Sequence, residues 1–255
     1  MNLLTVCIQA AKAAGTYVLS HKPRRDEVDE HFAHDVKLKL DRESQLVAEK
    51  AIHTLFPQSI ILGEEGSKSG EDGLEWVIDP IDGTVNFFHG IPWWCSSVAV
   101  RVNGEVMAGA VYAPEMNMLY SAELNGPAYL NDQAIQPSKI TTMGKALVIT
   151  GSEKEINPDD PPLATAQKLA PHVQKIRILG AAALDICQIA NGAADVFIQN
   201  GLYIWDIAAA GLIVRQAGGV YYQHSTAIAG RYACLAAANA TLADAMVSLA
   251  SNKSG

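Results

Sequence analysis

Two absences narrow the function of this chain: it has few cysteines, and it has no block of positive charge. The four cysteines lie far apart, without the CxxC spacing of zinc sites, at Cys7, Cys95, Cys187 and Cys234. We expect reduced thiols inside the core. The formal net charge is −8, and apart from residues 22–25 the basic residues are scattered, which argues against a nucleic acid polymer as partner.

Long apolar runs and nucleophile motifs are also missing. No apolar run approaches the length of a membrane span, and Gln9 and Lys12 interrupt the N-terminal segment where a signal peptide would be apolar. These features predict a cytoplasmic protein without membrane contact. No serine or cysteine lies in a recognisable nucleophile motif, so hydrolytic chemistry would use water as the nucleophile.

What the sequence does contain is enough apolar residues, 49% of 255, for a sizeable core. Apolar residues at helical spacing predict helices over residues 3–20 and 41–55, the second with Asp41 as its N-cap. Residues 21–39 between them are polar, and we expect an exposed connection in which His31 and His34 are solvated. Strands are predicted at 60–62, 76–78, 97–102, 106–112, 118–122 and 128–130, with Asn103-Gly104 as a hairpin turn.

The pattern changes after Pro137, where strands and helices alternate. Strands are predicted at 146–150, 175–179, 195–198 and 220–222, and helices at 163–169, 181–190, 207–217 and 242–249. Alternation of this kind suggests a layered α/β unit. We therefore predict two halves, an α+β half over residues 1–140 and an α/β half over residues 141–255.

The segment EWVIDPIDGTVNFFHG carries two aspartates three positions apart, Asp79 and Asp82. Pro80 keeps Asp79 out of the helical region, so the strand must end there. Gly83 permits a sharp turn, and a short helix can open at Thr84 with its amide groups facing the same corner as the carboxylates. A helix N-terminus and metal-binding carboxylates together are suited to phosphate. Taken alone, however, Asp-Pro-x-Asp-Gly is also ordinary turn chemistry.

Other carboxylates also follow apolar runs. Glu64 and Glu65 come directly after a predicted strand, and Asp206 begins a predicted helix, so each has a plain alternative as a solvated loop residue or an N-cap. Mg²⁺ is commonly held by a few carboxylates together with phosphate and water. Glu64, Asp79, Asp82 and Asp206 could form such a set, with Asp79 shared between two ions about 3.5–4 Å apart.

Three segments resemble the signature segments of the inositol monophosphatase family of Mg²⁺-dependent, lithium-sensitive phosphatases. They are GEEG at 63–66, WVIDPIDGTVNF at 76–87 and WDIAAAGLIVRQAGG at 205–219. Their order and spacing fit, and the resemblance spans nearly the whole chain. It implies an α+β fold built as a layered α/β/α/β/α sandwich of the sugar-phosphatase type, with the site between the halves.

The resemblance also implies the site residues. Glu64, Asp79 and the Ile81 carbonyl would hold one metal, while Asp79, Asp82 and Asp206 would hold a second, within a set of two or three Mg²⁺ ions. The implied catalytic residues are Glu64, which positions the attacking water, Thr84, which contacts that water, and Asp41 behind Thr84. Phosphate and alcohol contacts are implied for Asp82, Gly83, Thr84, Gly180, Ala181, Ala182, Gln199 and Asp206.

Two departures from the family pattern stand out. The Thr or Ser that the family often has shortly before the residue matched by Asp41 is missing from DVKLKLD. The position matched to an acidic inositol contact is Gln199, which can still hydrogen-bond a sugar hydroxyl. Inositol 1-phosphate is the first candidate substrate, because DGTVNF keeps the asparagine of that branch.

Other substrates and roles stay open. Fructose-1,6-bisphosphatase and 3′-phosphoadenosine 5′-phosphate phosphatase are alternatives in the same family, and a non-catalytic metal-binding or regulatory module is the alternative from another class. The implied partners are a small phosphorylated polyol or sugar and a second copy of the chain in a homodimer.

Overall fold

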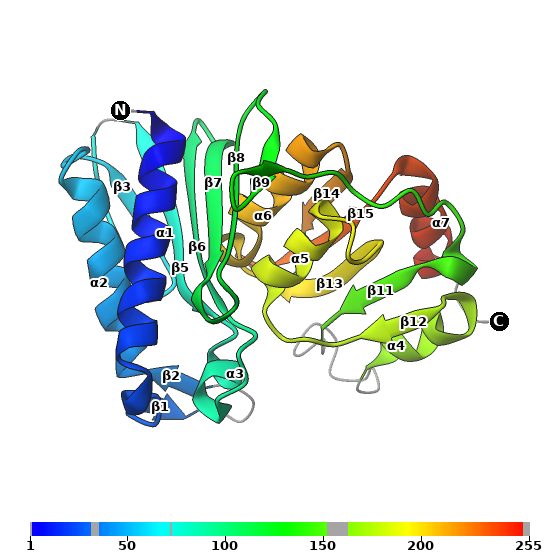
Figure 1. Cartoon of the computed structure of the whole chain (residues 1–255), viewed down its shortest axis with the longest axis horizontal. Coiled ribbons are helices and arrows are strands. Elements are labelled where there is room, and N and C mark those ends of the chain that lie inside the picture. The colour runs from blue at the N-terminus through cyan, green and yellow to red at the C-terminus, as the bar shows by residue number, and fades with distance from the viewer. Residues whose placement is uncertain (1, 32–35, 72, 152–162, 252–255) are drawn as a thin grey trace.

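Two β-sheets and three helical layers alternate along the long axis of the molecule (Figure 1), which gives the expected α/β/α/β/α order. The computed structural model describes residues 2–31, 36–71, 73–151 and 163–251. The first sheet draws its strands from residues 60–134 and the second from residues 147–237. The functional site lies where one end of the first sheet meets the middle helices.

The first sheet has eight strands in the order β10-β9-β8-β7-β6-β5-β3-β4, and only β3 and β5 are parallel neighbours. Asn103 and Gly104, between β6 and β7, have φ of 51° and 83°, as a two-residue hairpin turn of the primed type requires. The strands are β3 Ile60–Gly63, β4 Gly66–Lys68, β5 Leu74–Asp82, β6 Cys95–Val102, β7 Glu105–Ala113, β8 Met118–Glu123, β9 Ala128–Leu130 and β10 Gln133–Ala134.

The outer face of this sheet is covered by α1 (Leu3–Ser20) and α2 (Lys39–His53). In the described part of the chain, α1 is the one helix whose length and composition would allow it to cross a membrane, contrary to the expectation from the sequence. Its apolar face, which includes Val6 and Ala10, is fully buried in a core cluster with α2 and strands β5, β6 and β7. We therefore interpret α1 as a core helix.

The second sheet has five strands in the order β12-β11-β13-β15-β14. They are β11 Leu147–Thr150, β12 Lys175–Arg177, β13 Val196–Leu202, β14 Val220–Ser225 and β15 Tyr232–Ala237, and the sequence patterns missed β15. The helices α4 (Ala164–Leu169) and α7 (Ala240–Ser251) lie on its outer side (Figure 1). A separate core cluster joins α7 to this sheet through Leu242 and Met246.

The middle layer consists of α5 (Ala182–Ala190) and α6 (Ile204–Ala217), packed between the two sheets (Figure 1). The most extensive core cluster joins both helices to strands of both sheets. A methyl group on Gly109 of β7 would lie 2.8 Å from Ala209 Cα of α6, so the absence of a side chain at residue 109 lets this helix sit directly on the sheet. The two predicted halves therefore share one core.

The described residues of the segment 21–39 are more ordered than the predicted exposed connection. They form a short 3₁₀ turn (Lys22–Arg24) and an antiparallel pair, β1 (Val28–His31) and β2 (Val36–Leu38). Val36 and Leu38 are buried because they pack in one cluster with Ile81, Phe87 and Trp94 at the end of the first sheet. His34 lies outside the described residues, whereas the prediction of reduced, buried cysteines is confirmed for all four.

Short elements complete the chain. α3 (Thr84–His89) follows β5 and begins at the predicted residue. His89 is the last residue of that helix. Three further 3₁₀ turns connect longer elements at Pro114–Met116, Met143–Lys145 and Ala170–His172.

Candidate metal and phosphate site

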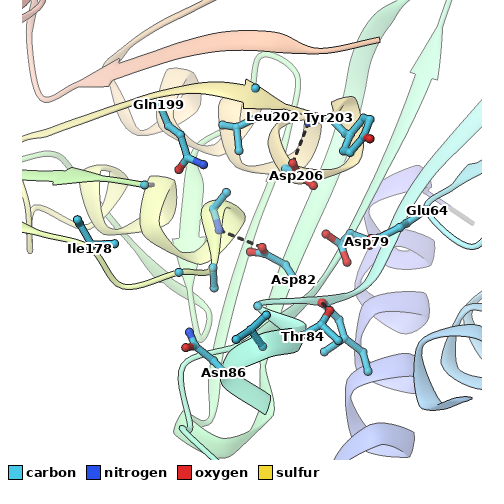
Figure 2. Close-up of a pocket in the computed structure, with 18 of the residues that line it drawn as sticks. Glu64, Asp79, Asp82, Thr84, Asn86, Ile178, Gln199, Leu202, Tyr203 and Asp206 are labelled. Atoms are coloured by element: carbon cyan, nitrogen blue, oxygen red, sulfur yellow. Dashed lines mark hydrogen bonds between the residues drawn. The ribbon is translucent and has the colours of Figure 1, made fainter. Parts of the chain in front are cut away.

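A cavity of about 380 Å³ lies between the end of β5, the start of α5, the end of β13 and the start of α6. The carboxylates of Asp79 and Asp82 from β5 and of Asp206 from α6 point into it (Figure 2). All residues that the sequence singled out for metal or substrate line this one cavity except Asp41: Glu64, Asp79, Ile81, Asp82, Gly83, Thr84, Gly180, Ala181, Ala182, Gln199 and Asp206.

A β-bulge explains how Asp79 and Asp82 reach the same cavity. Residues three apart in a regular strand point to opposite faces of a sheet. In the pairing of β5 with β6, Asp79 lies opposite Ser97 and Asp82 lies opposite Cys95, so β5 contains one extra residue. The extra residue places both carboxylates on the same side of the sheet. Within the bulge, Ser96 Oγ donates a hydrogen bond to the Pro80 carbonyl at 2.6 Å.

Asp41 and Asp206 hold the same position at the starts of two different helices. The prediction that Asp41 is an N-cap is wrong, and the N-cap alternative for Asp206 is wrong as well, because each is the third residue of its helix. Asp41 Oδ2 accepts the Leu38 N–H at 2.7 Å, and Asp206 Oδ2 accepts the Tyr203 N–H at 2.8 Å (Figure 2 for Asp206). One oxygen of each carboxylate thus orients the side chain, because it satisfies a backbone donor that the helix leaves unpaired.

Asp79 has unfavourable electrostatic surroundings. It is only 2% exposed, and its Oδ1 atom has no hydrogen-bond partner among the described residues. Burial raises the pKa of Asp79 well above its usual range, and the negative charges of Glu64, Asp82 and Asp206 raise it further. Burial likewise raises the pKa values of Asp41 and Asp206. A buried carboxylate without a donor requires a proton or a cation.

Asp82 is better satisfied, because the N-terminus of α5 donates to it. Its Oδ1 accepts the Ala182 N–H at 2.9 Å, and its Oδ2 accepts the Ala183 N–H at 2.7 Å (Figure 2 draws the bond from Ala182). Burial raises the pKa of Asp82 to about 6, and these amide hydrogen bonds oppose the increase. A residue of the first sheet is thereby fixed by a helix one hundred positions later in the chain.

The donor set of this cavity fits hard divalent cations. Mg²⁺ is held by oxygen ligands, and the cavity offers four carboxylates, one of which, Asp79, has a buried oxygen without a partner among the described residues. In the described residues, no group of three or more His, Cys, Asp or Glu side chains is already arranged around a single point that could hold an ion.

Glu64 is presented by the tight turn between β3 and β4, and a side chain of α2 clamps that turn. Gln45, which is 4% exposed, accepts the Glu65 N–H at 2.9 Å and donates to the Gly66 carbonyl at 3.1 Å. Gln45 also donates to the buried carboxylate of Glu49 at 2.9 Å. Sequence reasoning did not identify Gln45, since its role depends on contacts with residues about twenty positions away.

The expected relationship between Asp41 and Thr84 is present as a long contact. Thr84 Oγ1 donates to the Ile81 carbonyl at 2.8 Å and lies 3.5 Å from Asp41 Oδ1. Gly83 precedes α3 with φ of 87°, and a methyl group there would lie 3.0 Å from both Ala181 Cβ and the Trp93 carbonyl oxygen. Both the turn and the close approach of α5 explain why this position is glycine.

Gly180, Ala181 and Ala182, before and at the start of α5, line another part of the cavity together with Gln199 of β13. Figure 2 labels Gln199. β13 also contains a bulge, because Gln199 pairs with Cys234 whereas Leu202 pairs with Tyr232. Both sheets therefore have an irregular strand where they meet the cavity.

Two side-chain contacts missed by the sequence reasoning tie the walls together. Asn86 donates to the carbonyls of Trp93 and Leu179, both at 2.8 Å. Trp93 Nε1 donates to the buried carboxylate of Asp185 at 2.7 Å. The neighbouring Trp94 is fully buried.

A cationic wall residue was also missed. Arg231 lines the cavity and donates to the Gly201 carbonyl at 2.6 Å. No local motif marks it, since it lies between the turn residue Gly230 and Tyr232, the first residue of β15.

Five alternating layers with an acidic cavity where the sheets meet the middle helices define the class: this is the fold of the sugar phosphatases. The family model described as the inositol monophosphatase family matches residues 1–253, and the chain belongs to that family of Mg²⁺-dependent phosphomonoesterases.

Named relatives agree with this assignment. Over 221 residues the chain is 34% identical to a Thermotoga maritima protein named fructose-1,6-bisphosphatase/inositol-1-monophosphatase, which covers 86% of this chain and 84% of that protein. Over 219 residues it is 33% identical to Nus factor SuhB of Xylella fastidiosa, covering 85% and 80% of the two chains. The crystal structure of extragenic suppressor protein SuhB from Bartonella henselae is similar with a TM-score of 0.90, at 28% identity over 98% of both chains.

Proposed function

We propose that this chain hydrolyses small phosphate monoesters with Mg²⁺, and that inositol 1-phosphate is its first candidate substrate. The observation that supports this proposal best is the environment of Asp79. Its carboxylate is buried, faces a cavity shared with Glu64, Asp82 and Asp206, and keeps one oxygen without a partner among the described residues. A cation would stabilise this arrangement in the ionised form.

In this proposal, Glu64, Asp79 and the Ile81 carbonyl hold one Mg²⁺, and Asp79, Asp82 and Asp206 hold a second, in a set of two or three ions. Asp79 is the shared ligand. Bound Mg²⁺ supplies positive charge that lowers the pKa of a water molecule and stabilises the leaving oxygen.

The residues of the chain then orient the reaction. Glu64 accepts a hydrogen bond from the attacking water, and the Thr84 oxygen can accept a second one while its hydroxyl donates to Asp41 Oδ1, 3.5 Å away. Water attacks phosphorus opposite the alcohol oxygen, and the bond from phosphorus to that oxygen breaks. The attacking water releases a proton and the departing alcohol oxygen takes one up from solvent, so inorganic phosphate and the free alcohol form without a covalent intermediate with the protein.

Substrate contacts follow from the same cavity. The amide groups of Gly83 and Thr84 lie at the start of α3 and would bind phosphate oxygens. Gly180, Ala181 and Ala182 would line the alcohol side, and Gln199 would hydrogen-bond an alcohol hydroxyl. Asp82 and Asp206 would also face hydroxyl groups near the reacting phosphate.

The alternatives differ in substrate or in turnover. Fructose 1,6-bisphosphate is supported as a second candidate substrate by the name of the Thermotoga maritima relative. 3′-Phosphoadenosine 5′-phosphate is a third. Several relatives are named Nus factor SuhB, so a binding role without turnover is the alternative from another class. We propose no nucleic acid polymer as partner, because the chain has a net charge of −8 and no basic block.

The test is phosphate release from inositol 1-phosphate and from the other two esters, with and without Mg²⁺. We expect release that depends on Mg²⁺ and is lost on chelation. Mg²⁺ binding measured by calorimetry without phosphate release from any small monoester would support the non-catalytic alternative and reject the enzyme.

The remaining family properties belong to the same proposal. We expect inhibition by Li⁺, a homodimer in solution and a cytoplasmic location. Phosphate-release assays with Li⁺ and light scattering on the purified chain test the first two, and cell fractionation tests the third.

A further inference from the structure

Two adjacent glutamates in the turn between β3 and β4 have different surroundings. Glu64 and Glu65 lie between Gly63 and Gly66, which pair with each other across the two strands. Glu64 lines the acidic cavity, whereas Glu65 does not. The side chain of Glu65 is nevertheless only 11% exposed, so a second negative charge lies largely buried next to a proposed metal ligand. The turn thus offers two candidate ligands, and the structure places one of them at the cavity.

Lys37 of β2 compensates the charge of Glu65. Its Nζ lies 3.0 Å from Glu65 Oε1, and among the described residues it is the one ion-pair partner of that carboxylate. The residues on either side of the lysine, Val36 and Leu38, are buried, which fixes the backbone that carries it. The Lys37 side chain is 36% exposed, so solvent reaches this ion pair mainly from the lysine side.

The charge of Lys37 also acts on the residues around the cavity. Burial lowers the pKa of Lys37, but the hydrogen bond to Glu65 and the negative charges around the ammonium together outweigh burial and raise it. Those charges belong to Glu65, Glu64 and Asp41. The lysine is therefore protonated at neutral pH. Its positive charge lies within electrostatic range of the proposed metal ligand as well as of its own partner.

We propose that Lys37 is a positioning residue that holds the Glu65 carboxylate away from the metal site and leaves Glu64 as the single ligand from this turn. This inference rests on the proposed Mg²⁺ site. Because the ammonium neutralises one of the two carboxylates, the turn presents a net charge of −1 to the cavity instead of −2. Coulomb energy scales with the product of the charges, so a divalent cation responds twice as strongly as a monovalent one to this difference.

The two members of the ion pair should affect Mg²⁺ binding in opposite directions. Lys37→Met leaves Glu65 uncompensated beside Glu64, so Mg²⁺ should bind about 3- to 10-fold more tightly. Glu65→Gln leaves the ammonium beside Glu64 without its partner, so Mg²⁺ should bind about 3- to 10-fold more weakly, because the lysine then competes with the ion. The double variant lacks both charges and should bind Mg²⁺ nearly as the unaltered chain does.

Calorimetric titration with Mg²⁺ measures these affinities without substrate, and thermal unfolding checks the fold of each variant. The Mg²⁺ concentration that gives half-maximal phosphate release from inositol 1-phosphate should shift in the same directions. Lys37→Arg keeps the positive charge and should keep the affinity of the unaltered chain.

The matched control is the ion pair between Lys22 and Glu115, at 2.6 Å, whose side chains are 29% and 14% exposed. It joins two 3₁₀ turns that do not line the cavity. Lys22→Met and Glu115→Gln should leave the affinity for Mg²⁺ unchanged, although each removes a charge and breaks an ion pair.

A shift of the same sign in Lys37→Met and Glu65→Gln would overturn the proposal and leave the ion pair as a support of the turn, since both substitutions break it. Unchanged affinity in both variants would overturn it as well, while Mg²⁺-dependent phosphate release by the unaltered chain would still support the proposed function. If the unaltered chain binds Mg²⁺ but releases no phosphate, the enzyme is rejected and calorimetry still decides the role of Lys37. A chain that binds no Mg²⁺ would reject both.

Discussion

Asp79 combines deep burial with an oxygen that has no partner in the described part of the chain. Natural interiors rarely tolerate such a group, because an unpaired buried carboxylate is expensive to desolvate. The negative charges of the neighbouring carboxylates destabilise the ionised form of Asp79 further. Destabilising groups of this kind concentrate at functional sites. Replacing them with apolar residues would make the protein more stable but would remove the function.

Replacing this carboxylate should separate activity from stability. We predict that Asp79→Asn lowers phosphate release by more than about 100-fold, because the shared metal ligand is lost. The same variant without metal should unfold at a higher temperature than the unaltered chain, because one buried negative charge is removed. Differential scanning calorimetry in metal-free buffer measures this.

The matched control for this substitution is Asp132→Asn, at an exposed turn position whose positive φ asparagine tolerates well. It should change neither activity nor unfolding temperature appreciably. An Asp79→Asn protein with normal turnover would contradict the bridging role.

Asp82 links the site to pH. Burial raises the pKa of Asp82 from 3.8 to about 6. The folded, metal-free chain therefore binds a proton at this carboxylate more tightly than the unfolded chain does. The associated stability is complete below about pH 4 and is lost as pH rises toward 6. Raised pKa values at Asp79 and Asp206 act in the same direction.

We therefore predict that the free energy of unfolding of the metal-free chain falls between about pH 4.5 and pH 6, as measured by urea titration. The paired surface carboxylates Glu27, Glu43 and Glu115 have lowered pKa values and titrate below this window. Mg²⁺ should raise stability more at pH 7 than at pH 5, since it competes with protons for the same oxygens. Equal Mg²⁺ effects at both pH values would exclude these carboxylates as its ligands.

At the scale of elements, the turn between β3 and β4 depends on α2. Gln45 bonds to two backbone groups of this turn, and Lys68 of β4 forms an ion pair with Glu49 of α2. Glu64 has a defined position because helix and turn are joined in this way. The two bulges in β5 and β13 act similarly, since each redirects a strand at the edge of the cavity.

Gln45→Leu should loosen this turn. We predict a loss of about 1–3 kcal/mol in the free energy of unfolding, because two backbone groups lose their buried partner. Amide hydrogen exchange should accelerate at residues 64–66, and kcat should fall about tenfold with little change in KM for the substrate, since Glu64 orients water and not the alcohol.

Gln188→Leu is the matched control for Gln45→Leu. Gln188 is a buried amide of α5 that donates to the Tyr120 hydroxyl at 3.1 Å and to the Leu184 carbonyl at 3.0 Å. It should destabilise the chain without faster exchange at residues 64–66. If both variants reduce kcat by the same factor, the effect of Gln45 is general destabilisation and not positioning.

At the scale of the whole molecule, the cavity exists because α5 and α6 are held between two sheets. α6 carries Asp206 in its first turn and contacts β7 through Ala209 one turn later. The distance between Asp206 and the carboxylates of β5 therefore depends on how closely this helix approaches the first sheet.

Gly109→Ala should push these layers apart. A methyl group there would lie 2.8 Å from Ala209 Cα, and we predict destabilisation of about 1–3 kcal/mol by urea unfolding. Phosphate release should fall as well, because the carboxylates are displaced. Gly144→Ala is the control: nothing lies within 4 Å of its added methyl group, so stability should change by less than about 0.5 kcal/mol. A neutral Gly109→Ala would show that the layers adjust easily.

The sequence by itself determined the elements whose patterns are local. Helical spacing of apolar residues predicted α1 over its full length, and Asn103-Gly104 predicted the turn between β6 and β7. The positions of the carboxylates at the ends of elements were also visible, and so was the family, because three short segments occur in the right order. These features depend on backbone preferences and spacing within a few residues.

Only the tertiary structure decided how those residues face one another. The bulge that brings Asp79 and Asp82 to one side, the α5 amides that hold Asp82 and the presence of Arg231 in the cavity all depend on contacts between distant segments. Asp41 and Asp206 were misplaced as N-caps, because either position at a helix start satisfies a backbone donor. Side-chain environments arise when separate layers pack, and no local pattern of residues encodes that packing.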